Sequence, residues 1–380
     1  MDALTTLSNW QRVRLGDVAE IIGGGTPSTQ ITSFWNGSIN WFTPTEIGIT
    51  KYVHKSQRTI TLLGLKKSSA KLLPIGTILL TSRASIGDCA ILKVVATTNQ
   101  GFQSLIPLEK INNEFLYYLM LTLKNKLLKL ASGSTFLEVS PNKIKNLLIP
   151  LPSLNEQIAI ANILSDVDHY LYSLDALILK KESVKKALSF ELLSQRKRLK
   201  GFNQNWQRVR LGDICEITTG SLDANEMVYY GKYRFYTCAK EYYFIDKYAF
   251  DTEAILISGN GAYVGYVHYY KGKFNAYQRT YVLDNFSEHI IFVKYFLTMF
   301  LQSHIQTNKN EGNTPYIVMG TLKDFEILLP PLNEQIAIAN ILSALDNEIT
   351  SLKNKKRQFE NIKKALNHDL MSAKIRVLNK

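Results

Sequence analysis

The sequence has few of the features that mark secreted, membrane-spanning or metal-binding proteins. It contains three cysteines in 380 residues, Cys89, Cys215 and Cys238, and none of them has the C-x-x-C spacing of a redox or zinc site. No run of about 18 apolar residues suggests a membrane span. The first ten residues lack the basic and apolar regions of a signal peptide. We therefore expect a cytoplasmic protein in a reducing compartment, with no structural zinc and no membrane partner.

Familiar catalytic motifs are also missing. The chain has no Walker A sequence, no H-E-x-x-H, no G-x-S-x-G and no N-P-P-Y-like methyltransferase motif. Its six histidines are scattered without ligand spacing. The glycine-rich segments 23–27 and 259–265 fit turns better than phosphate cradles, because neither opens a helix. The sequence predicts no catalytic residue, no metal site and no cofactor on this chain.

Charge is present in excess but is unevenly placed. The net charge of +13 favours a polyanionic partner, although a generally basic protein would show the same balance. Residues 10–152 hold 16 Lys and Arg against 7 Asp and Glu, whereas residues 206–331 hold 12 against 13. The second stretch contains 15 of the 20 tyrosines. Phosphate contacts need cations, but base edges are also read by neutral polar side chains.

Two strings occur twice. LNEQIAIANILS occupies 154–165 and 332–343, and WQRVRLGD occupies 10–17 and 206–213. A period of 178 to 196 residues is too long for a solenoid and indicates a duplicated module. Between the repeated strings, the stretches up to Pro152 and Pro331 have diverged. The pattern predicts one scaffold that presents two different surfaces.

A long segment without proline or glycine follows each of the strings Ile149-Pro-Leu-Pro and Leu329-Pro-Pro. Asn155 and Asn333 stand where an N-cap is expected. Apolar residues then recur at heptad spacing, which predicts two helices that pack on each other in antiparallel orientation. Packing of each helix on its own domain is the alternative. These apolar positions are Ile160, Leu164, Val167, Leu171, Leu174, Ile178, Leu188 and Leu192 in the first helix, and Ile338, Leu342, Leu345, Ile349, Leu352, Phe359, Leu366 and Leu370 in the second.

The first helix would measure roughly 58 Å from 155 to 193, at 1.5 Å per residue. Four lysines interrupt the apolar seam and are expected at its edge or reaching out to solvent. They are Lys181, Lys185, Lys356 and Lys363.

The stretches between the repeated strings have the composition of mixed α/β domains. Short β-branched or aromatic runs predict strands at 77–80, 90–95, 254–258 and 263–270. One helical run is expected in each domain, at 113–130 and 288–304. The fold class is therefore α+β, with an internal pseudo-two-fold repeat. We expect domains at 1–153 and 201–331, and helical spacers at 154–200 and 332–380.

Taken together, the duplicated strings resemble the specificity subunits of Type I restriction-modification enzymes. The resemblance also includes Asp168 and Asp346 after the helical strings, the segment Arg198-Leu-Lys-Gly-Phe202, and the terminal Leu370-Met-Ser-Ala-Lys-Ile-Arg. It covers essentially the whole chain. One departure is Lys200, where a proline is usual in this family.

The resemblance implies a function in DNA recognition. Each variable domain would read one half of a bipartite double-stranded DNA target, and the paired helices would fix the unread spacer. Two methyltransferase subunits would dock on the chain, with restriction-translocase subunits as possible further partners. S-adenosylmethionine, ATP and Mg²⁺ would be bound by those partners, and the target adenine would be flipped for N6 methylation.

By position in the family's domains, polar loop residues are the candidates for reading DNA bases, with a turn hydrogen bond or a phosphate contact as the alternative for each. Asn99 and Gln100 have a strand-end cap as a further alternative. The first domain offers Thr43, Thr45, Arg83, Ser85, Asn99 and Gln100, and the second offers Thr237, Asn260, Tyr263, Gln278 and Arg279. Arginine suits guanine, and asparagine or glutamine suits adenine. The candidates for partner docking and helix packing are Asn155, Glu156, Gln157, Ile160 and Leu164, with Asn333, Glu334, Gln335, Ile338 and Leu342.

Two other functions stay open at this point. A scaffold with two sugar- or peptide-binding domains predicts no salt-sensitive DNA affinity, whereas a DNA reader loses affinity steeply with salt. A single-chain nuclease or methyltransferase predicts catalysis by the purified chain alone, which the missing motifs disfavour.

Overall fold

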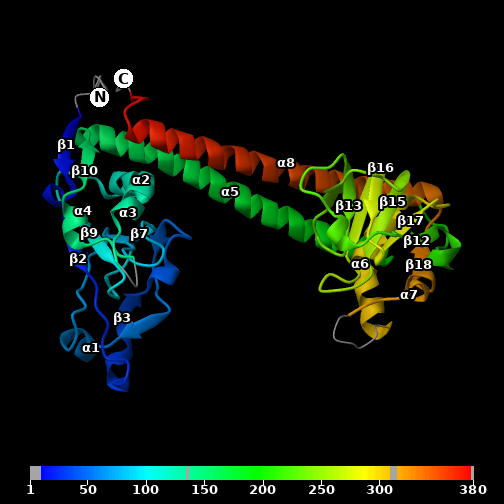
Figure 1. Cartoon of the computed structure of the whole chain (residues 1–380), viewed down its shortest axis with the longest axis horizontal. Helices are drawn as coiled ribbons and strands as arrows, with labels where there is room; N and C mark the ends of the chain where they lie inside the picture. Colours follow the sequence, from blue (N-terminus) through cyan, green and yellow to red (C-terminus); the bar gives the residue numbers. More distant parts are fainter. Residues whose placement is uncertain (1–9, 134–136, 309–314, 378–380) are drawn as a thin grey trace. The chain divides into compact units, whose positions relative to one another are not determined.

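The computed structural model describes residues 10–133, 137–308 and 315–377. The chain divides into two compact units. Unit 1 contains residues 1–174 and 355–380, and unit 2 contains residues 175–354. Each unit therefore combines one globular domain with part of each long helix (Figure 1).

Unit 1 is built on two sheets and a short strand pair. Strands β1 and β10 pair antiparallel, so that WQRVRLGD is joined to the segment just before the long helix. A five-stranded sheet has the order β2-β9-β6-β7-β4, and a three-stranded sheet has the order β5-β3-β8. The strands are β1 (Gln11–Arg14), β2 (Ala19–Gly23), β3 (Trp35–Phe42), β4 (Tyr52–Val53), β5 (Arg58–Ile60), β6 (Ile78–Leu80), β7 (Cys89–Leu92), β8 (Ala96–Thr98), β9 (Gln103–Pro107) and β10 (Leu148–Leu151). The helices are α1 (Leu62–Lys66), α2 (Asn113–Thr122), α3 (Lys124–Leu130) and α4 (Pro141–Lys145).

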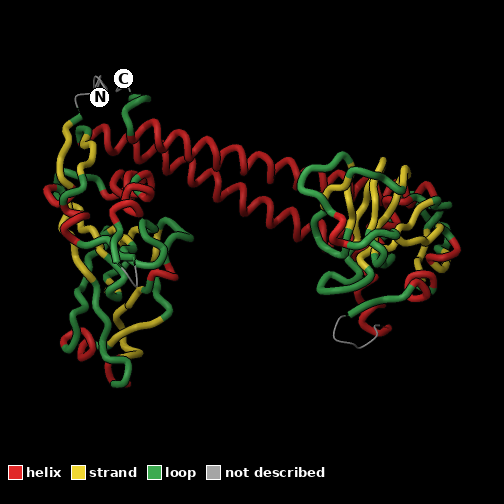
Figure 2. The backbone as a smooth tube through the Cα atoms, in the orientation of Figure 1, coloured by secondary structure: helices red, strands yellow, loops and turns green. Residues whose placement is uncertain are grey.

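Unit 2 repeats this plan with one larger sheet. Strands β11 and β18 pair antiparallel at the same place as β1 and β10. The six-stranded sheet has the order β12-β17-β15-β16-β13-β14, and its strands lie side by side in Figure 2. The strands are β11 (Gln207–Arg210), β12 (Glu216–Thr219), β13 (Tyr233–Tyr236), β14 (Tyr243–Ile245), β15 (Phe250–Ser258), β16 (Val267–Ala276), β17 (Thr280–Asp284) and β18 (Glu326–Leu329). The helices are α6 (Ile290–Asn308) and α7 (Met319–Lys323).

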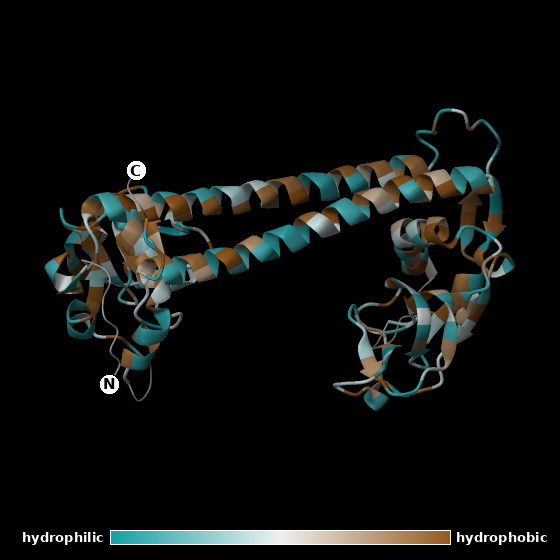
Figure 3. Ribbon diagram, turned by 90° about the horizontal axis from the view of Figure 1, so that it is seen from above, coloured by the Kyte–Doolittle hydropathy of each residue, from teal (hydrophilic) through white to brown (hydrophobic). Residues whose placement is uncertain are grey.

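The two long helices are α5 (Leu154–Leu193) and α8 (Leu332–Met371). They run antiparallel in both units, because Tyr170 contacts Phe359 in unit 1 and Lys181 contacts Glu348 in unit 2. Apolar and polar residues alternate along both helices (Figure 3). The predicted seam is confirmed by its buried members, which are Ile160, Leu164, Leu174, Ile178 and Leu192, with Ile338, Leu342, Ile349 and Leu370.

Each long helix packs on the other helix and also on the core of a domain, so both packing alternatives are observed. The first turns of α5 lie in the hydrophobic core of unit 1, where Ile160 and Leu164 meet Leu370 of α8. The first turns of α8 lie in the core of unit 2, where Ile338 meets Leu192 of α5. Each domain core is thus completed by one end of each long helix.

Several details differ from the sequence predictions. The strand expected at 263–270 runs from Val267 to Ala276, and residues 263–265 form a turn. The helices begin at Leu154 and Leu332, so Asn155 and Asn333 lie inside the first turn, and Ser153 accepts the amide hydrogen bonds at the start of α5. The helix expected at 113–130 is interrupted at Leu123. Residues 24–28 have no regular secondary structure and form no turn, and the turn follows at Thr29.

The lysines of the apolar seam lie at its edge, which was one of the two expected placements. Lys185 forms an ion pair with Asp346 across the helix pair, and Lys363 does the same with Asp168. Both lysine side chains are only about a quarter exposed, at 27% and 24%. These two cations are therefore matched by carboxylates on the opposite helix, whereas Lys356 pairs with Glu360 of its own helix.

Candidate functional site

The polar loops of unit 1 meet at one edge of its sheets. The amide of Asn99 donates to the carbonyl of Phe42, which precedes the candidates Thr43 and Thr45. The amide of Ser82, which precedes Arg83, donates to the carbonyl of Gly101, which follows Gln100. Three loops far apart in sequence are thereby tied together, and all six candidates of this domain lie on them.

Several of these side chains are already engaged by their neighbours. The Oγ1 of Thr43 donates to the Oε2 of Glu46 at 2.8 Å. The Oδ1 of Asn99 accepts the amide of Gly101 at 2.8 Å. Arg83 forms a 2.7 Å ion pair with Glu138. Thr45 and Gln100 are exposed, and Ser85 is half-buried.

Unit 2 builds the equivalent edge from the same backbone bonds. The amide of Tyr277 donates to the carbonyl of Tyr236, which precedes Thr237. The amide of Gly259, which precedes Asn260, donates to the carbonyl of Arg279. The five candidates of this domain are likewise brought together.

The side chains at this second edge differ in burial. Gln278, Arg279 and Tyr263 are exposed, whereas Thr237 is buried at 6% exposure. Asn260 takes the place of Arg83, because both form an isolated bridge with the segment that precedes the last short helix of the domain. An arginine in one unit is thus replaced by a neutral amide in the other.

The Glu-Gln pair of the helical string fastens each domain to its helix. Glu156 is 9% exposed and accepts a 3.0 Å hydrogen bond from the indole of Trp10. Glu334 is fully buried and accepts a 3.2 Å bond from the indole of Trp206. Arg198 adds two bonds to the carboxylate of Glu334. The two duplicated strings are therefore bonded to each other in both units.

The glutamines that follow, Gln157 and Gln335, also join each domain to its long helix. The Oε1 of Gln157 accepts the amide of Asn112 at 2.8 Å, at the start of α2. The Oε1 of Gln335 accepts the amide of His289 at 3.0 Å, at the start of α6. Both glutamines are essentially unexposed. These side chains hold the fold together from inside and are not free to meet a partner.

The exposed residues of the same string form a different set. Leu154 and Leu332 are about half exposed, and Ile158 and Ile336 are each 39% exposed. Asn155 and Asn333 are exposed beside them. Eight of the ten docking candidates, all except these two asparagines, are buried within their own unit. The surface that a partner can touch is therefore the face with Leu154 and Ile158, and its twin with Leu332 and Ile336.

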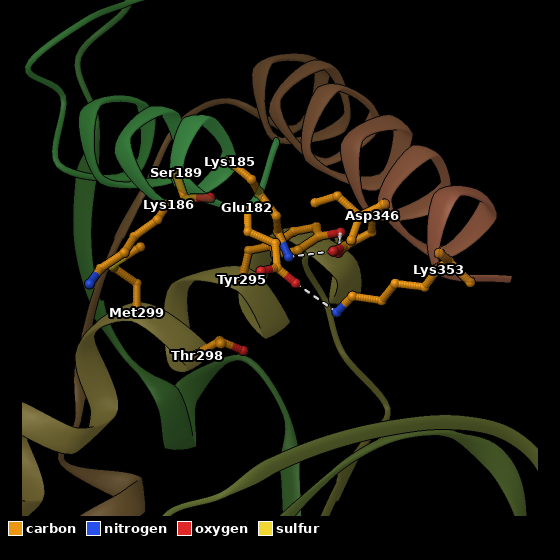
Figure 4. A pocket seen from close by; sticks show the side chains of 11 residues that line it. Glu182, Lys185, Lys186, Ser189, Tyr295, Thr298, Met299, Asp346 and Lys353 are labelled. Carbon is orange, nitrogen blue, oxygen red and sulfur yellow. Dashed lines mark hydrogen bonds and ion pairs between the residues drawn. The ribbon is translucent and has the colours of Figure 1, made fainter. Parts of the chain in front are cut away.

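Each unit also has a groove between its domain helix and the two long helices. In unit 2 the groove has a volume of about 390 Å³, and its lining includes Lys185, Tyr295 and Asp346 (Figure 4). The hydroxyl of Tyr295 donates to Asp346 at 2.6 Å. In unit 1 a groove of about 540 Å³ lies beside α2, with Lys363 and Asn367 in its wall.

Burial and hydrogen bonds together set the pKa values of the side chains in the groove of unit 2. Burial by itself raises the pKa of Asp346, but the hydrogen bonds from Lys185 and Tyr295 outweigh it and hold that pKa below its usual range. Burial and the bond to Asp346 raise the pKa of Tyr295. Burial lowers the pKa of Lys294. The tyrosine stays a neutral donor and the aspartate a charged acceptor, which suits a fixed joint better than proton transfer.

The sequence predictions missed these tyrosines, and they named Lys185 and Lys363 without their ion-pair partners. In unit 1 the hydroxyl of Tyr118 donates to Asp168 at 2.5 Å, as Tyr295 does to Asp346 in unit 2. A further repeat carried the signal. Glu182-Ser-Val-Lys-Lys-Ala-Leu188 matches Glu360-Asn-Ile-Lys-Lys-Ala-Leu366, and the matching Lys185 and Lys363 are the two ion-paired lysines.

Within the described ranges, no cluster of three or more His, Cys, Asp or Glu could hold a metal ion. None of the described helices is apolar enough over a sufficient length to cross a membrane.

Comparison with known proteins agrees with this architecture. Residues 7–181 and 203–361 each match the Type I restriction modification DNA specificity domain. The MjaIX specificity subunit of Methanocaldococcus jannaschii is 30% identical over 365 residues, covering 85% of this chain and 83% of the relative. The EcoDI specificity subunit of Escherichia coli is 40% identical over 163 residues, covering 42% of this chain and 35% of the relative.

Solved structures show the same fold. The specificity subunit of the Type I system of M. genitalium superposes with a TM-score of 0.64 at 20% identity and covers 97% of both chains. The corresponding subunit from Thermoanaerobacter tengcongensis gives 0.53 at 19% identity, covering 97% of this chain and 98% of that one.

The fold and the repeated polar edges define a protein with two related domains, each of which carries a cluster of polar loops. The chain belongs to the Type I restriction-modification specificity family, since two matches to the specificity domain span most of its length. The predicted α+β fold, the paired helices and the internal repeat are confirmed.

Proposed function

We propose that this chain supplies DNA sequence specificity to a cytoplasmic Type I restriction-modification complex. The recognition domains 1–153 and 201–331 each read one half of a bipartite double-stranded target. The spacers 154–200 and 332–380 fix the number of unread base pairs and dock two methyltransferase subunits. Those partners supply S-adenosylmethionine and methylate adenine, and restriction subunits would bring ATP and Mg²⁺.

One observation carries this proposal. Equivalent backbone hydrogen bonds hold the candidate loops in both units, while the side chains on those loops differ. A common frame with different polar side chains is what two different half-sites require, because sequence is read by side chains that reach base edges. Thr43, Thr45, Arg83, Ser85, Asn99 and Gln100 are the proposed contacts in the first domain, and Thr237, Asn260, Tyr263, Gln278 and Arg279 in the second.

The test is a methylome. The chain is expressed with a Type I methyltransferase partner in a methylation-free host, and N6-methyladenine is mapped by long-read sequencing. We expect a split motif with a fixed gap that disappears when this chain is omitted. No motif, despite a soluble and bound partner, would reject DNA recognition. A contiguous motif would reject the proposal that the two domains read two separate half-sites.

The spacer is tested separately. Four residues inserted after Ser173 in α5 lengthen a helix by about 6 Å at 1.5 Å per residue. We expect a longer unread gap with both half-sites unchanged. Altered half-sites with an unaltered gap would show that the helices do not set the spacing. Exchange of residues 10–152 for a relative's domain is expected to change one half-site only.

The docking surface is proposed to be the duplicated exposed face, with Leu154 and Ile158 in unit 1 and Leu332 and Ile336 in unit 2. The occupant is one methyltransferase subunit per face. The supporting argument is identity at exposed positions, where packing does not constrain the residue type. Ile158→Asp and Ile336→Asp are each expected to remove one methyltransferase copy from the complex, as measured by native mass spectrometry.

The matched control is Leu179→Asp. Leu179 is 64% exposed on α5 and has no apolar twin, because Arg357 stands at the equivalent position of α8. A complex that keeps two methyltransferase copies after both isoleucine changes would contradict this assignment.

A further inference from the structure

The two recognition domains carry different chemistry around their candidate loops. In unit 1, residues 47–87 contain seven Lys and Arg and no Asp or Glu. Two of the seven are bound internally, because Lys51 pairs with Glu114 and Arg83 with Glu138. The remaining five form what we name the basic strip, and all five are exposed: Lys55, Arg58, Lys66, Lys67 and Lys71.

The basic strip has no carboxylate to neutralise it. Among the described residues, no acidic side chain pairs with any of its five members, and Arg58 instead stacks on Trp35 at 3.8 Å from the ring centroid. Exposed like charges without a carboxylate beside them repel one another. An anionic partner removes that repulsion.

The basic strip lies on both sides of the candidate loops of unit 1. The amide of Gln57, between Lys55 and Arg58, donates to Glu46 at 2.7 Å, and the same carboxylate holds Thr43. On the other side, Gly25 packs against Ser69, and its amide donates to the carbonyl of Thr98, next to Asn99. The side chains of the neighbouring residues Thr26 and Gln100 are hydrogen-bonded.

In the part of unit 2 that the structure describes, no run of exposed bases without carboxylates is comparable to the basic strip. Acids and bases alternate along the paired strands β15 and β16, where Lys271 pairs with Glu253 and Lys273 lies 3.9 Å from Asp251. These pairs lie near the start of β15, whereas the candidate Asn260 follows its end. Unit 2 instead exposes aromatic side chains. Tyr229 and Tyr230 are 94% and 96% exposed. Their loop begins at Leu222, whose carbonyl accepts the amide of Gln278, a candidate reading residue.

Two neighbouring tyrosines that are almost fully exposed contribute nothing to the core, so the fold does not explain them. Tyrosine bonds phosphate and sugar oxygens as a neutral donor. Such contacts add affinity without the counterion release that accompanies cationic contacts.

We propose that the two domains hold DNA by different physical means. The first domain binds phosphates through the basic strip, and the second domain binds its half-site through the exposed Tyr229 and Tyr230. The inference rests on the proposed function of DNA reading. It predicts that the salt dependence of the whole complex originates mainly in the first domain.

The experiment measures the affinity of the methyltransferase complex for a duplex with its mapped target, at salt concentrations between 50 and 200 mM. One variant replaces Lys55, Lys66, Lys67 and Lys71 with Gln and keeps Arg58, because Arg58 packs on Trp35. If each lysine meets one phosphate, the slope of log affinity against log salt falls by up to about 3.6, at about 0.9 per contact. The loss of affinity over this fourfold salt range then shrinks by up to about 150-fold.

The second variant carries Tyr229→Ala and Tyr230→Ala. We expect weaker binding at every salt concentration with the slope unchanged. The control carries Lys126→Gln and Lys129→Gln, two exposed lysines on α3 of unit 1 that lie outside the basic strip. It is expected to change the slope by less than one.

The outcomes separate the inference from the function on which it rests. A wild-type complex with no preference for its mapped target would reject DNA reading itself. If the wild type binds specifically but the four-lysine variant and the control have equal slopes of log affinity against log salt, the basic strip does not bind phosphates. Full affinity in the double tyrosine variant would overturn the aromatic contact.

Discussion

Glu334→Gln is the most informative single substitution for the joint between a domain and its helices. The carboxylate is fully buried and accepts hydrogen bonds from Arg198 at 3.2 and 2.6 Å and from Trp206 at 3.2 Å. The glutamine keeps the shape but removes the charge opposite the guanidinium. Breaking a buried ion pair costs about 3–5 kcal/mol. Because the Arg198 side chain is 28% exposed and recovers some hydration, we expect a loss of about 2–3 kcal/mol.

Unit 1 provides the matched control in Glu156→Gln. Glu156 also accepts an indole bond, from Trp10 at 3.0 Å. Its basic partner, Arg376, is 45% exposed, and the Nε of Arg376 lies 3.7 Å from the Oε1 of Glu156. That oxygen is buried and has no hydrogen-bond partner among the described residues. An ion pair without a hydrogen bond to a half-exposed arginine contributes about 1 kcal/mol or less, so this change is expected to be mild.

Hydrogen exchange measured by mass spectrometry separates the two units. Peptides from 207–214 and 332–345 report the free energy of local opening in unit 2, and peptides from 10–17 and 154–165 report it in unit 1. We expect faster exchange in unit 2 for Glu334→Gln and little change in unit 1 for Glu156→Gln. Equal losses in both units would refute the reasoning, because they would show that the indole bond, which both units share, holds the joint.

Three further predictions test other parts of the structure. Burial raises the pKa of both Cys89 and Cys215 to about 12, so their thiols stay protonated at pH 8, and a maleimide is expected to label Cys238 first, as read by peptide mass. Burial lowers the pKa of His268 from its ordinary value of 6.5; the unfolded chain then takes up the proton first, so unit 2 loses stability as pH falls below about 6.5, and urea unfolding of His268→Gln is expected to lose this part of the slope. Gly24→Ala places a Cβ 1.9 Å from the carbonyl oxygen of Asn99 and is expected to abolish recognition of one half-site in the methylome, whereas Gly320→Ala meets nothing within 4 Å and leaves the motif unchanged.

The organisation of the chain was predictable because duplicated strings and regular apolar spacing indicate it. Heptad spacing identified the two helices, and the seam residues Leu164 and Leu342 are fully buried as expected. The strands at 77–80 and 254–258 were also recognised, because buried strands appear as short β-branched runs bounded by glycine or serine. Both signals are local in sequence.

The parts that escaped prediction are the start of each long helix and the pairing of side chains distant in sequence. An N-cap was assigned to Asn155 from composition, yet the preceding Ser153 starts the helix. Lys185 broke the apolar pattern and was expected at the edge of the seam or reaching out to solvent, but the pattern did not reveal the carboxylate 161 residues away that pairs with it. The bond from the amide of Gly101 to the side-chain oxygen of Asn99 is local by contrast, and it is the turn hydrogen bond that the sequence left open as the alternative to DNA contact. Sequence pattern gives the element, whereas pairing across the fold decides what a polar side chain does there.

Identity at exposed positions is the part of the repeat that the fold leaves unexplained. Exposed substitutions usually change stability by no more than about 0.5 kcal/mol, so packing does not require Ile158 and Ile336 to match. Between the matching segments, exposed positions differ freely, as with Tyr172 and its equivalent Thr350.

Along the two long helices, the matching exposed positions that form contiguous strings fall into two sets. One is the start of each long helix, and the other is the Glu-x-x-Lys-Lys-Ala-Leu string, where Lys186 and Ala187 match Lys364 and Ala365. Unit 1 contains the start of α5 and the later string of α8, and unit 2 contains the start of α8 and the later string of α5. Each unit therefore presents one copy of each set, contributed by different helices. This arrangement accommodates one identical partner per unit, and it explains why a chain that reads two different half-sites repeats part of its surface unchanged.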